Sequence, residues 1–200
     1  LSIVREAMVQ AAEGRASLEI TFGENNQSVQ SGEISRHLDL GVDVLAVNTV
    51  DAASSPLILE KAGIRGLSVV FFNNEPDAVD MPAEGWYYVG TRAEQSGIMA
   101  GELMAEYFRD NPGADKDGDG VIRCVILKGR IGDLDAELRT EYCVKAFREA
   151  GFNLAMIAAE TANWQRAEAR EVMAEWLASY TGIEAVFANN DDMALGAIDA

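Results

Sequence analysis

Short, almost continuous apolar runs alternate with longer segments of helical periodicity along the whole chain. A strand without a polar face must be covered on both faces, so this alternation predicts an α/β fold of parallel sheets flanked by helices. The spacing predicts strands at 17–22, 42–47, 67–72, 86–89, 121–127, 154–159 and 185–188. It predicts helices at 27–40, 93–110, 135–150 and 165–179, a helix that begins near Pro56, and a last helix from Met193 to Ala200. It also predicts an opening helix, whose apolar residues at helical spacing are Leu1, Ile3, Val4, Ala7, Met8 and Ala11.

Two of these helices have apolar faces that we expect to pack into the core. In the helix at 27–40 the face comprises Val29, Ile34, Leu38 and Leu40. In the helix at 93–110 it comprises Ile98, Met99, Leu103, Met104, Tyr107 and Phe108. With Met173, the methionines at helical spacing are expected to fill the core rather than bind a metal.

A strand ends at Val89–Gly90–Thr91, which is the natural place for a domain boundary. We therefore expect two Rossmann-like lobes, an N-terminal lobe at 1–91 and a C-terminal lobe at 92–200. Helical spacing already runs through the first and last residues without a start or stop signal. This predicts that the chain is a segment of a longer one and that each lobe is incomplete.

The charge balance excludes several classes of partner. The chain has 33 acidic and 16 basic residues, a formal net charge of −17. Nucleic acid requires a basic binding surface, so a nucleic-acid partner is not expected. No apolar run reaches the roughly 18 residues of a membrane span, so no membrane insertion is expected either.

The cysteines and the single histidine do not suggest a metal or catalytic site. Cys124 and Cys143 lie among apolar neighbours, which favours buried packing residues, although a disulfide between them stays open. His37 lies between Arg36 and Asp39 on a predicted helix, and we expect it at the surface.

Ligands of parallel sheets bind beyond the carboxyl ends of the strands, and this rule selects candidate residues. They are the polar positions after each strand, including Asn48, Asp51, 73–75, 129–135, 160–164 and 189–192, with Arg139 nearby. Amides, carboxylates, a guanidinium and an indole suit a neutral polyol. No nucleophile lies beside a base, so binding without chemistry is favoured, although the carboxylates of Asp133 and Asp135 leave acid/base chemistry open.

A second motif is the acidic loop at 115–123. Asp115, Asp117 and Asp119 occupy positions 1, 3 and 5 of a calcium loop, Gly follows at position 6, and Val121 would offer its carbonyl. Position 9 is Arg123 instead of an oxygen ligand, and the usual glutamate at position 12 is missing. The pattern favours calcium if a distant carboxylate completes the shell; the alternative is a solvated acidic turn.

Six motifs occur in an order and at a spacing that resemble the galactose/glucose-binding proteins of ABC sugar importers, members of the type I periplasmic binding protein family. They are Val-Phe-Phe-Asn-Asn-Glu-Pro at 70–76, Tyr-Tyr-Val-Gly-Thr at 87–91, the acidic loop with Leu-Lys-Gly at 127–129, Asp-Ala-Glu-Leu-Arg-Thr at 135–140, Thr-Ala-Asn-Trp at 161–164 and Ala-Asn-Asn-Asp at 188–191. The resemblance covers the whole chain and implies two lobes that close on a sugar. It also implies that the first strand precedes Leu1 and that further sugar contacts lie beyond Ala200.

The resemblance assigns roles to individual residues. Asn73 would bind sugar hydroxyls from the first lobe, Asp135, Arg139 and Asn190 from the second, and Trp164 would stack on the sugar ring. Asp133 stands where the family has a histidine, so we expect a ligand contact with an altered hydroxyl preference. The alternatives are a core role for Trp164, a simple ion pair between Arg139 and Asp135, and turn or helix-capping roles for the two asparagines.

The resemblance also implies a structural calcium ion, with Glu184 as the distant glutamate that completes the shell. Because Arg123 replaces a side-chain ligand of the family, we expect it to fold back and neutralise the carboxylates, with water filling the vacant position.

The function that the resemblance implies is that of a monomeric periplasmic receptor, not an enzyme, which delivers a monosaccharide to the permease of an ABC transporter. A chemoreceptor is a further possible partner. Two other readings stay open: the effector-binding core of a sugar-responsive repressor, which would need a basic helix-turn-helix upstream, and a metal-assisted α/β enzyme, which would need an open metal position beside a pocket.

Overall fold

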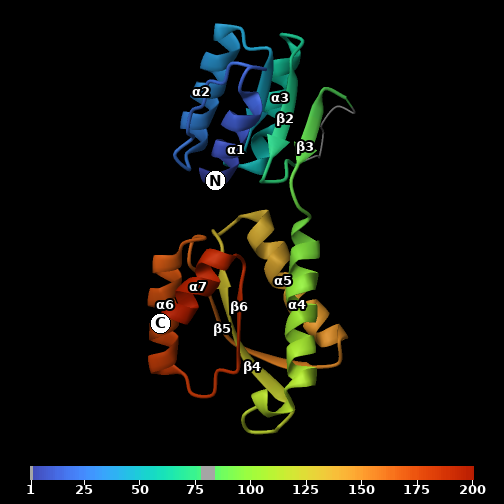
Figure 1. Ribbon diagram of the computed structural model, residues 1–200, viewed down its shortest axis with the longest axis vertical. Coiled ribbons are helices and arrows are strands. Elements are labelled where there is room, and N and C mark those ends of the chain that lie inside the picture. The colour runs from blue at the N-terminus through green and yellow to red at the C-terminus, as the bar shows by residue number, and fades with distance from the viewer. Residues whose placement is uncertain (1, 78–83) are drawn as a thin grey trace. The chain divides into compact units, whose positions relative to one another are not determined.

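The computed structural model describes residues 2–77 and 84–200, and Leu1 of the predicted opening helix lies outside them. It divides into two compact units, Leu1–Gly90 and Thr91–Ala200, one residue from the predicted boundary. Figure 1 labels the elements of each unit. Among the described residues, no helix is both long enough and apolar enough to cross a membrane.

Unit 1 is built on a parallel sheet of order β1-β2-β3. Its elements are α1 (Ser2–Ala12), α2 (Gln27–Leu40), β1 (Val44–Val47), the 3₁₀ turn η1 (Ala52–Ser54), α3 (Ser55–Gly63), β2 (Ser68–Phe72) and β3 (Trp86–Val89). Side chains from α2, α3, β1 and β2 form one core on one face of this sheet. Coverage of both faces was predicted, but here burial alternates, and Val44, Tyr87 and Val89 stay exposed.

Local signals fix the ends of α2 where the sequence predicts them. The Asn26 side chain accepts hydrogen bonds from the N–H groups of Ser28 and Val29, which caps the first turn. Gly41 ends the helix with φ 76°, a left-handed conformation that glycine adopts without strain. Ile34 and Leu38 are buried as expected, whereas Val29 and Leu40 are exposed.

Two predictions in unit 1 are wrong and share one cause. Residues 17–22 form no strand, because their alternating pattern finds no neighbouring strand to pair with, and Leu18, Ile20 and Phe22 are exposed. The segment instead lies against α2, where the Thr21 hydroxyl is 3.1 Å from Nε2 of His37. His37 is therefore buried rather than at the surface.

Unit 2 is built on a parallel sheet of order β5-β4-β6. Its elements are α4 (Ala93–Asp110), the 3₁₀ turn η2 (Pro112–Ala114), β4 (Val121–Lys128), α5 (Leu134–Glu149), β5 (Asn153–Thr161), α6 (Arg166–Ser179), β6 (Ala185–Ala188) and α7 (Asp191–Asp199). Helices α4 and α5 lie on one side of the sheet, and α6 and α7 lie on the other (Figure 1). This unit has the predicted coverage of both faces.

The central strand β4 joins the two halves of the core. Ile122, Cys124 and Ile126 point into the cluster with α4 and α5, which contains Phe108 and Phe147. Val125 and Leu127 point into the cluster with α6 and α7, which contains Met173, Trp176 and Met193. The four residues at 124–127 have no exposed surface, which explains why this strand is a continuous apolar run.

The predicted apolar face of α4 is only partly correct. Phe108 is buried, but Met99, Leu103 and Tyr107 are exposed, so Met99 is not a core residue. The helix instead presents small residues to α5, with Gly97, Gly101 and Ala105 buried at four-residue spacing. This stripe lets the two helix backbones approach closely, which a stripe of large side chains would prevent.

Replacing Gly101 tests this close approach. A Cβ there would collide with the Cys143 carbonyl oxygen of α5 and lie 2.9 Å from Ala146 Cβ. Gly101→Ala should therefore lower the free energy of unfolding by about 1–3 kcal/mol, measured by urea denaturation of the full-length protein. The control is Gly32→Ala on the exposed side of α2, where a Cβ meets nothing. It should raise the free energy by up to about 1 kcal/mol. Equal effects would contradict the packing argument.

Cys124 and Cys143 are buried and free, so the thiols act as packing groups. Burial raises the pKa of each thiol to about 12. We expect neither thiol to react with a thiol reagent at pH 8 in the native protein, and both to react after denaturation without reductant. Failure of both to react after denaturation would reveal a disulfide; mass spectrometry of the labelled peptides distinguishes the two outcomes.

Candidate functional site

Polar residues gather where the three strands of unit 2 end. The loop after β4 leads to Asp133 at the start of α5, the loop after β5 contains Trp164, and Asn189 and Asn190 follow β6. Because the strands are parallel, these loops lie at the same edge of the sheet. Five of the six predicted sugar-binding residues are therefore in one unit and at one edge, and the sixth, Asn73, is in unit 1.

Asn189 holds this edge together, and the sequence identified it only as one of several polar residues after strands. Its side chain is buried, accepts a hydrogen bond from the Gly129 N–H (2.9 Å) and donates one to Oγ1 of Thr140 (3.1 Å). Its carbonyl accepts a hydrogen bond from Nη1 of Arg139 at 3.0 Å. It thus ties the end of β6 to the end of β4 and to α5. The sequence signal that could have identified Asn189 is its position as an amide directly after a buried strand.

Trp164 is held in an unusual backbone conformation. It has φ 65° and the preceding Asn163 has φ 49°, in the left-handed region that side chains other than glycine rarely adopt. The indole lies so close to Gly129 that any side chain there would collide with it. The guanidinium carbon of Arg139 lies 5.9 Å from the centre of the ring. Strain of this kind is typical of functional positions, because the surrounding structure must impose it.

Asp133 uses both carboxylate oxygens within the protein. Oδ1 accepts the Asp135 N–H (3.1 Å) and so caps α5, and Oδ2 accepts Nε1–H of Trp164 (3.2 Å). Arg130 lies 3.5 Å from the same Oδ2. The residue predicted to contact the ligand thus caps a helix and orients the indole.

The remaining residues of this edge also have partners within unit 2. Nη2 of Arg139 lies 3.7 Å from Oδ2 of Asp135, one helical turn earlier, while its buried Nε has no hydrogen-bond partner. Asn190 caps α7 by accepting the Met193 N–H (2.9 Å) and donates to the Trp164 carbonyl (3.1 Å). The ion pair of Arg139 with Asp135 and the helix-capping role of Asn190, which the sequence left open as alternatives, are therefore both observed. The same side chains also line the edge of the sheet.

Asn73 follows β2 in unit 1 and has φ 64°. Its side-chain amide donates to the Asn74 Oδ1 (3.0 Å), and its carbonyl accepts a hydrogen bond from the Tyr88 hydroxyl (2.9 Å). Asn74 in turn donates from its amide nitrogen to the Thr49 carbonyl. Asn73 is exposed, so its amide is accessible to a ligand.

A small cavity within unit 2 lies between α4 and the strand ends, with Gly97, Arg139, Cys143 and Asn189 among its lining residues. Its volume of about 40 Å³ accommodates water. A monosaccharide does not fit in this cavity, so the candidate binding surface is the polar edge of the sheet rather than the cavity.

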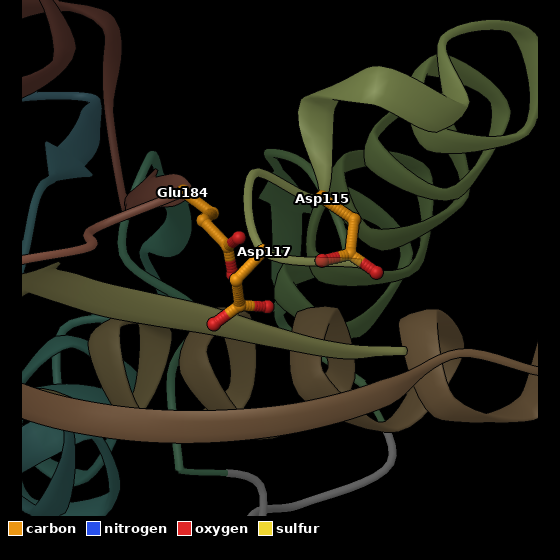
Figure 2. A group of neighbouring side chains, drawn as sticks. All are labelled: Asp115, Asp117 and Glu184. Atoms are coloured by element: carbon orange, nitrogen blue, oxygen red, sulfur yellow. The ribbon is translucent and has the colours of Figure 1, made fainter. Parts of the chain in front are cut away.

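The acidic loop lies at the opposite end of β4. Carboxylate oxygens of Asp115, Asp117 and Glu184 lie within 4.8 Å of one another, although Glu184 is distant from the other two in the sequence (Figure 2). Glu184 has a side chain only 1% exposed and accepts the N–H groups of Lys116 (2.7 Å) and Arg123 (2.8 Å). The hydrogen bond from Arg123 holds the pKa of Asp119 below its ordinary value.

Residues 2–200 match a family described as the periplasmic binding protein domain. The D-galactose/methyl-galactoside binding periplasmic protein MglB of Haemophilus influenzae is 37% identical over 205 residues, which cover 100% of this chain and 62% of that protein. A putative rhizopine-binding protein of Rhizobium meliloti is 29% identical, with 92% of this chain and 56% of that protein covered. The chain thus spans about three-fifths of the length of these curated relatives.

Solved structures give the same result for the fold. An ABC transporter solute-binding protein of Bacillus halodurans with bound myo-inositol has a TM-score of 0.80 and 29% identity, covering 96% of this chain and 63% of the other. A Mycobacterium smegmatis protein in complex with β-D-fucofuranose has a TM-score of 0.85 and 25% identity, covering 99% and 62%. The predicted type I periplasmic binding protein fold is therefore confirmed for this segment.

The capping role of Asp133 can be measured separately from any ligand. Asp133→Ala removes both the cap of α5 and the acceptor for the Trp164 indole, and it should lower the free energy of unfolding by about 1–2 kcal/mol. Asp133→Asn keeps a capping oxygen and loses only the acceptor for the indole, so it should lower the free energy of unfolding by less. Chemical denaturation without sugar provides both values. Equal losses in the two variants would contradict the capping role, because only Asp133→Ala removes the capping oxygen.

Proposed function

The chain belongs to the periplasmic binding protein family, and on this premise we propose that the full-length protein is a periplasmic receptor that binds a monosaccharide and delivers it to an ABC transporter. The observation that carries the proposal is the edge of unit 2 described above, where Trp164 and Arg139 lie together at the ends of three parallel strands. An aromatic face beside charged and amide groups is a surface that suits a sugar better than an apolar or an ionic ligand.

Each side chain has a chemical role in this proposal. Trp164 stacks on the C–H face of the sugar ring, and its hydrogen bond to Asp133 fixes the orientation of the indole. Arg139 donates hydrogen bonds to hydroxyl oxygens, and Asp135 accepts them from hydroxyl groups. Asn190 and, from unit 1, Asn73 provide amides that both donate and accept.

The sugar we propose is an aldose similar to galactose or glucose. Support comes from the 37% identity to a protein named for D-galactose and methyl-galactoside. Asp133 argues for a modified preference at one hydroxyl. Both of its oxygens already accept hydrogen bonds, so a hydroxyl near it would find fewer acceptors than a free carboxylate offers.

The proposed partners are the sugar and the permease of an ABC transporter, with a chemoreceptor as a further partner. We propose that the protein acts as a monomer in the periplasm and catalyses no reaction. The acidic loop precedes β4 and the sugar-binding edge follows it, so the eight residues of the strand separate them by about 25 Å. A cation bound there would be too far from the sugar for metal-assisted chemistry.

Replacing Trp164 tests the proposed stacking. In the full-length protein, Trp164→Leu should weaken monosaccharide binding by about tenfold or more, because one aromatic contact contributes about 1.5 kcal/mol. Isothermal titration with D-galactose and D-glucose, after a thermal-shift screen of other monosaccharides, gives the affinities. Bound sugar should raise the melting temperature by mass action.

The matched control is Trp176→Leu. Trp176 lies in the same core cluster as Trp164, but it is on α6 and its indole donates to Glu160. This variant should lose stability while its sugar affinity stays within about twofold. Equal losses of affinity would show that the effect of Trp164 is one of stability. A protein that binds none of the sugars would contradict the proposed function.

A further inference from the structure

A positive charge of the protein itself lies inside the acidic loop. The guanidinium of Arg123 contacts Asp119 Oδ2 (Nη2, 2.6 Å), Asp117 Oδ2 (Nη1, 2.9 Å) and the Val121 carbonyl (Nη1, 3.3 Å). Its Nη1 is also 3.7 Å from Glu184 Oε2. Four of the five predicted calcium ligands therefore face one guanidinium.

The backbone holds Arg123 in this place. Its N–H donates to Oε2 of Glu184 (2.8 Å), and its carbonyl accepts the N–H of Glu184 (2.9 Å). The next pair, Cys124 and Ala185, begins the ladder between β4 and β6. The side chain of Arg123 thus starts from a fixed point beside the carboxylates, and only 30% of it is exposed.

The remaining loop ligands are also occupied by protein donors. Asp115 accepts the N–H groups of Gly118 (2.9 Å) and Gly120 (2.9 Å). Asp117 and Asp119 each accept one N–H from the loop in addition to Arg123. The loop is therefore already closed by hydrogen bonds.

The residues present do not fit a calcium ion in this arrangement. Calcium takes six to eight oxygen ligands at about 2.3–2.6 Å, and position 9 offers a cation in place of an oxygen. An ion would have to displace the guanidinium from Asp117, Asp119 and the Val121 carbonyl. It would thereby break charge-assisted hydrogen bonds and bring two cations together.

We propose that the guanidinium of Arg123 takes the place of the calcium ion and holds the acidic loop against Glu184 without a metal. This goes beyond the expectation that Arg123 neutralises the carboxylates beside a bound ion. It also identifies Arg123 as the residue that determines whether the loop requires calcium.

The test is a calcium titration of the full-length protein without sugar, so its outcome is independent of the proposed sugar binding. The natural protein should show no change in melting temperature between 1 mM CaCl₂ and excess chelator, and no heat of binding. Arg123→Gln supplies an oxygen at position 9 and removes the competing charge. It should bind calcium at least about tenfold more tightly than the natural protein, and its melting temperature should fall in chelator and recover with calcium.

Lys116→Gln is the matched control for charge alone. Lys116 lies in the same loop, but its Nζ donates to the Ile183 carbonyl at 2.9 Å instead of a carboxylate of the loop. Removing it changes the net charge by the same amount, and it should not create calcium-dependent stability. If both variants gain calcium binding equally, general charge is the cause and the proposal fails.

Two further outcomes overturn the proposal. One is a natural protein that loses stability in chelator and regains it with calcium. The other is an Arg123→Gln variant that neither binds calcium nor loses stability in chelator, since the guanidinium would then not be holding the loop. If the variant is unfolded in chelator, recovery of its circular dichroism spectrum on adding calcium supports the proposal. A failure to recover, while Lys116→Gln stays folded, counts against it as these two outcomes do, because calcium would then not replace the guanidinium.

Discussion

Burial of β4 on both faces is the constraint on which the rest of unit 2 depends. Cys124, Val125, Ile126 and Leu127 have no exposed surface, and alternate side chains enter two different core clusters. Full burial of such side chains contributes about 1.5–3 kcal/mol each for the large ones, so the position of the strand is fixed strongly. The beginning of β4 fixes the acidic loop, and the end of β4 fixes the residues around Asn189 and Trp164. One packed strand thus positions a charged cluster and a candidate binding surface.

The parts of the fold that local chemistry determines were predictable from the sequence. The helix at 93–110 and the helix at 27–40 were predicted from their apolar spacing with the observed bounds, and in the structure Asn26 and Gly41 cap the latter. Features that depend on a residue distant in the sequence could not be predicted in this way. The pattern at 17–22 is that of a strand, but a strand needs a neighbour, and the segment covers His37 instead. In α4 the large apolar side chains predicted the buried face, whereas the face that is buried against α5 consists mainly of small residues.

The candidate site shows the same division. The rule that ligands bind beyond the ends of parallel strands located the edge of unit 2 and its residues. The internal partners of those residues were not visible in the sequence: Asp133 caps α5 and orients Trp164, and Asn189 ties three elements together. Arg123 was recognised as a departure from the calcium-loop pattern, but only the structure shows that its guanidinium reaches four of the predicted ligands.

The central claim is that the indole of Trp164 forms one face of the sugar site. The most direct test is to follow the indole N–H signals of the full-length protein by NMR while a monosaccharide that binds is titrated. The account predicts a large shift of the Trp164 signal and a smaller one for Trp176, which is buried in the core cluster and whose indole donates to Glu160 near the end of β5. A sugar that binds while the Trp164 signal stays unchanged would contradict the account.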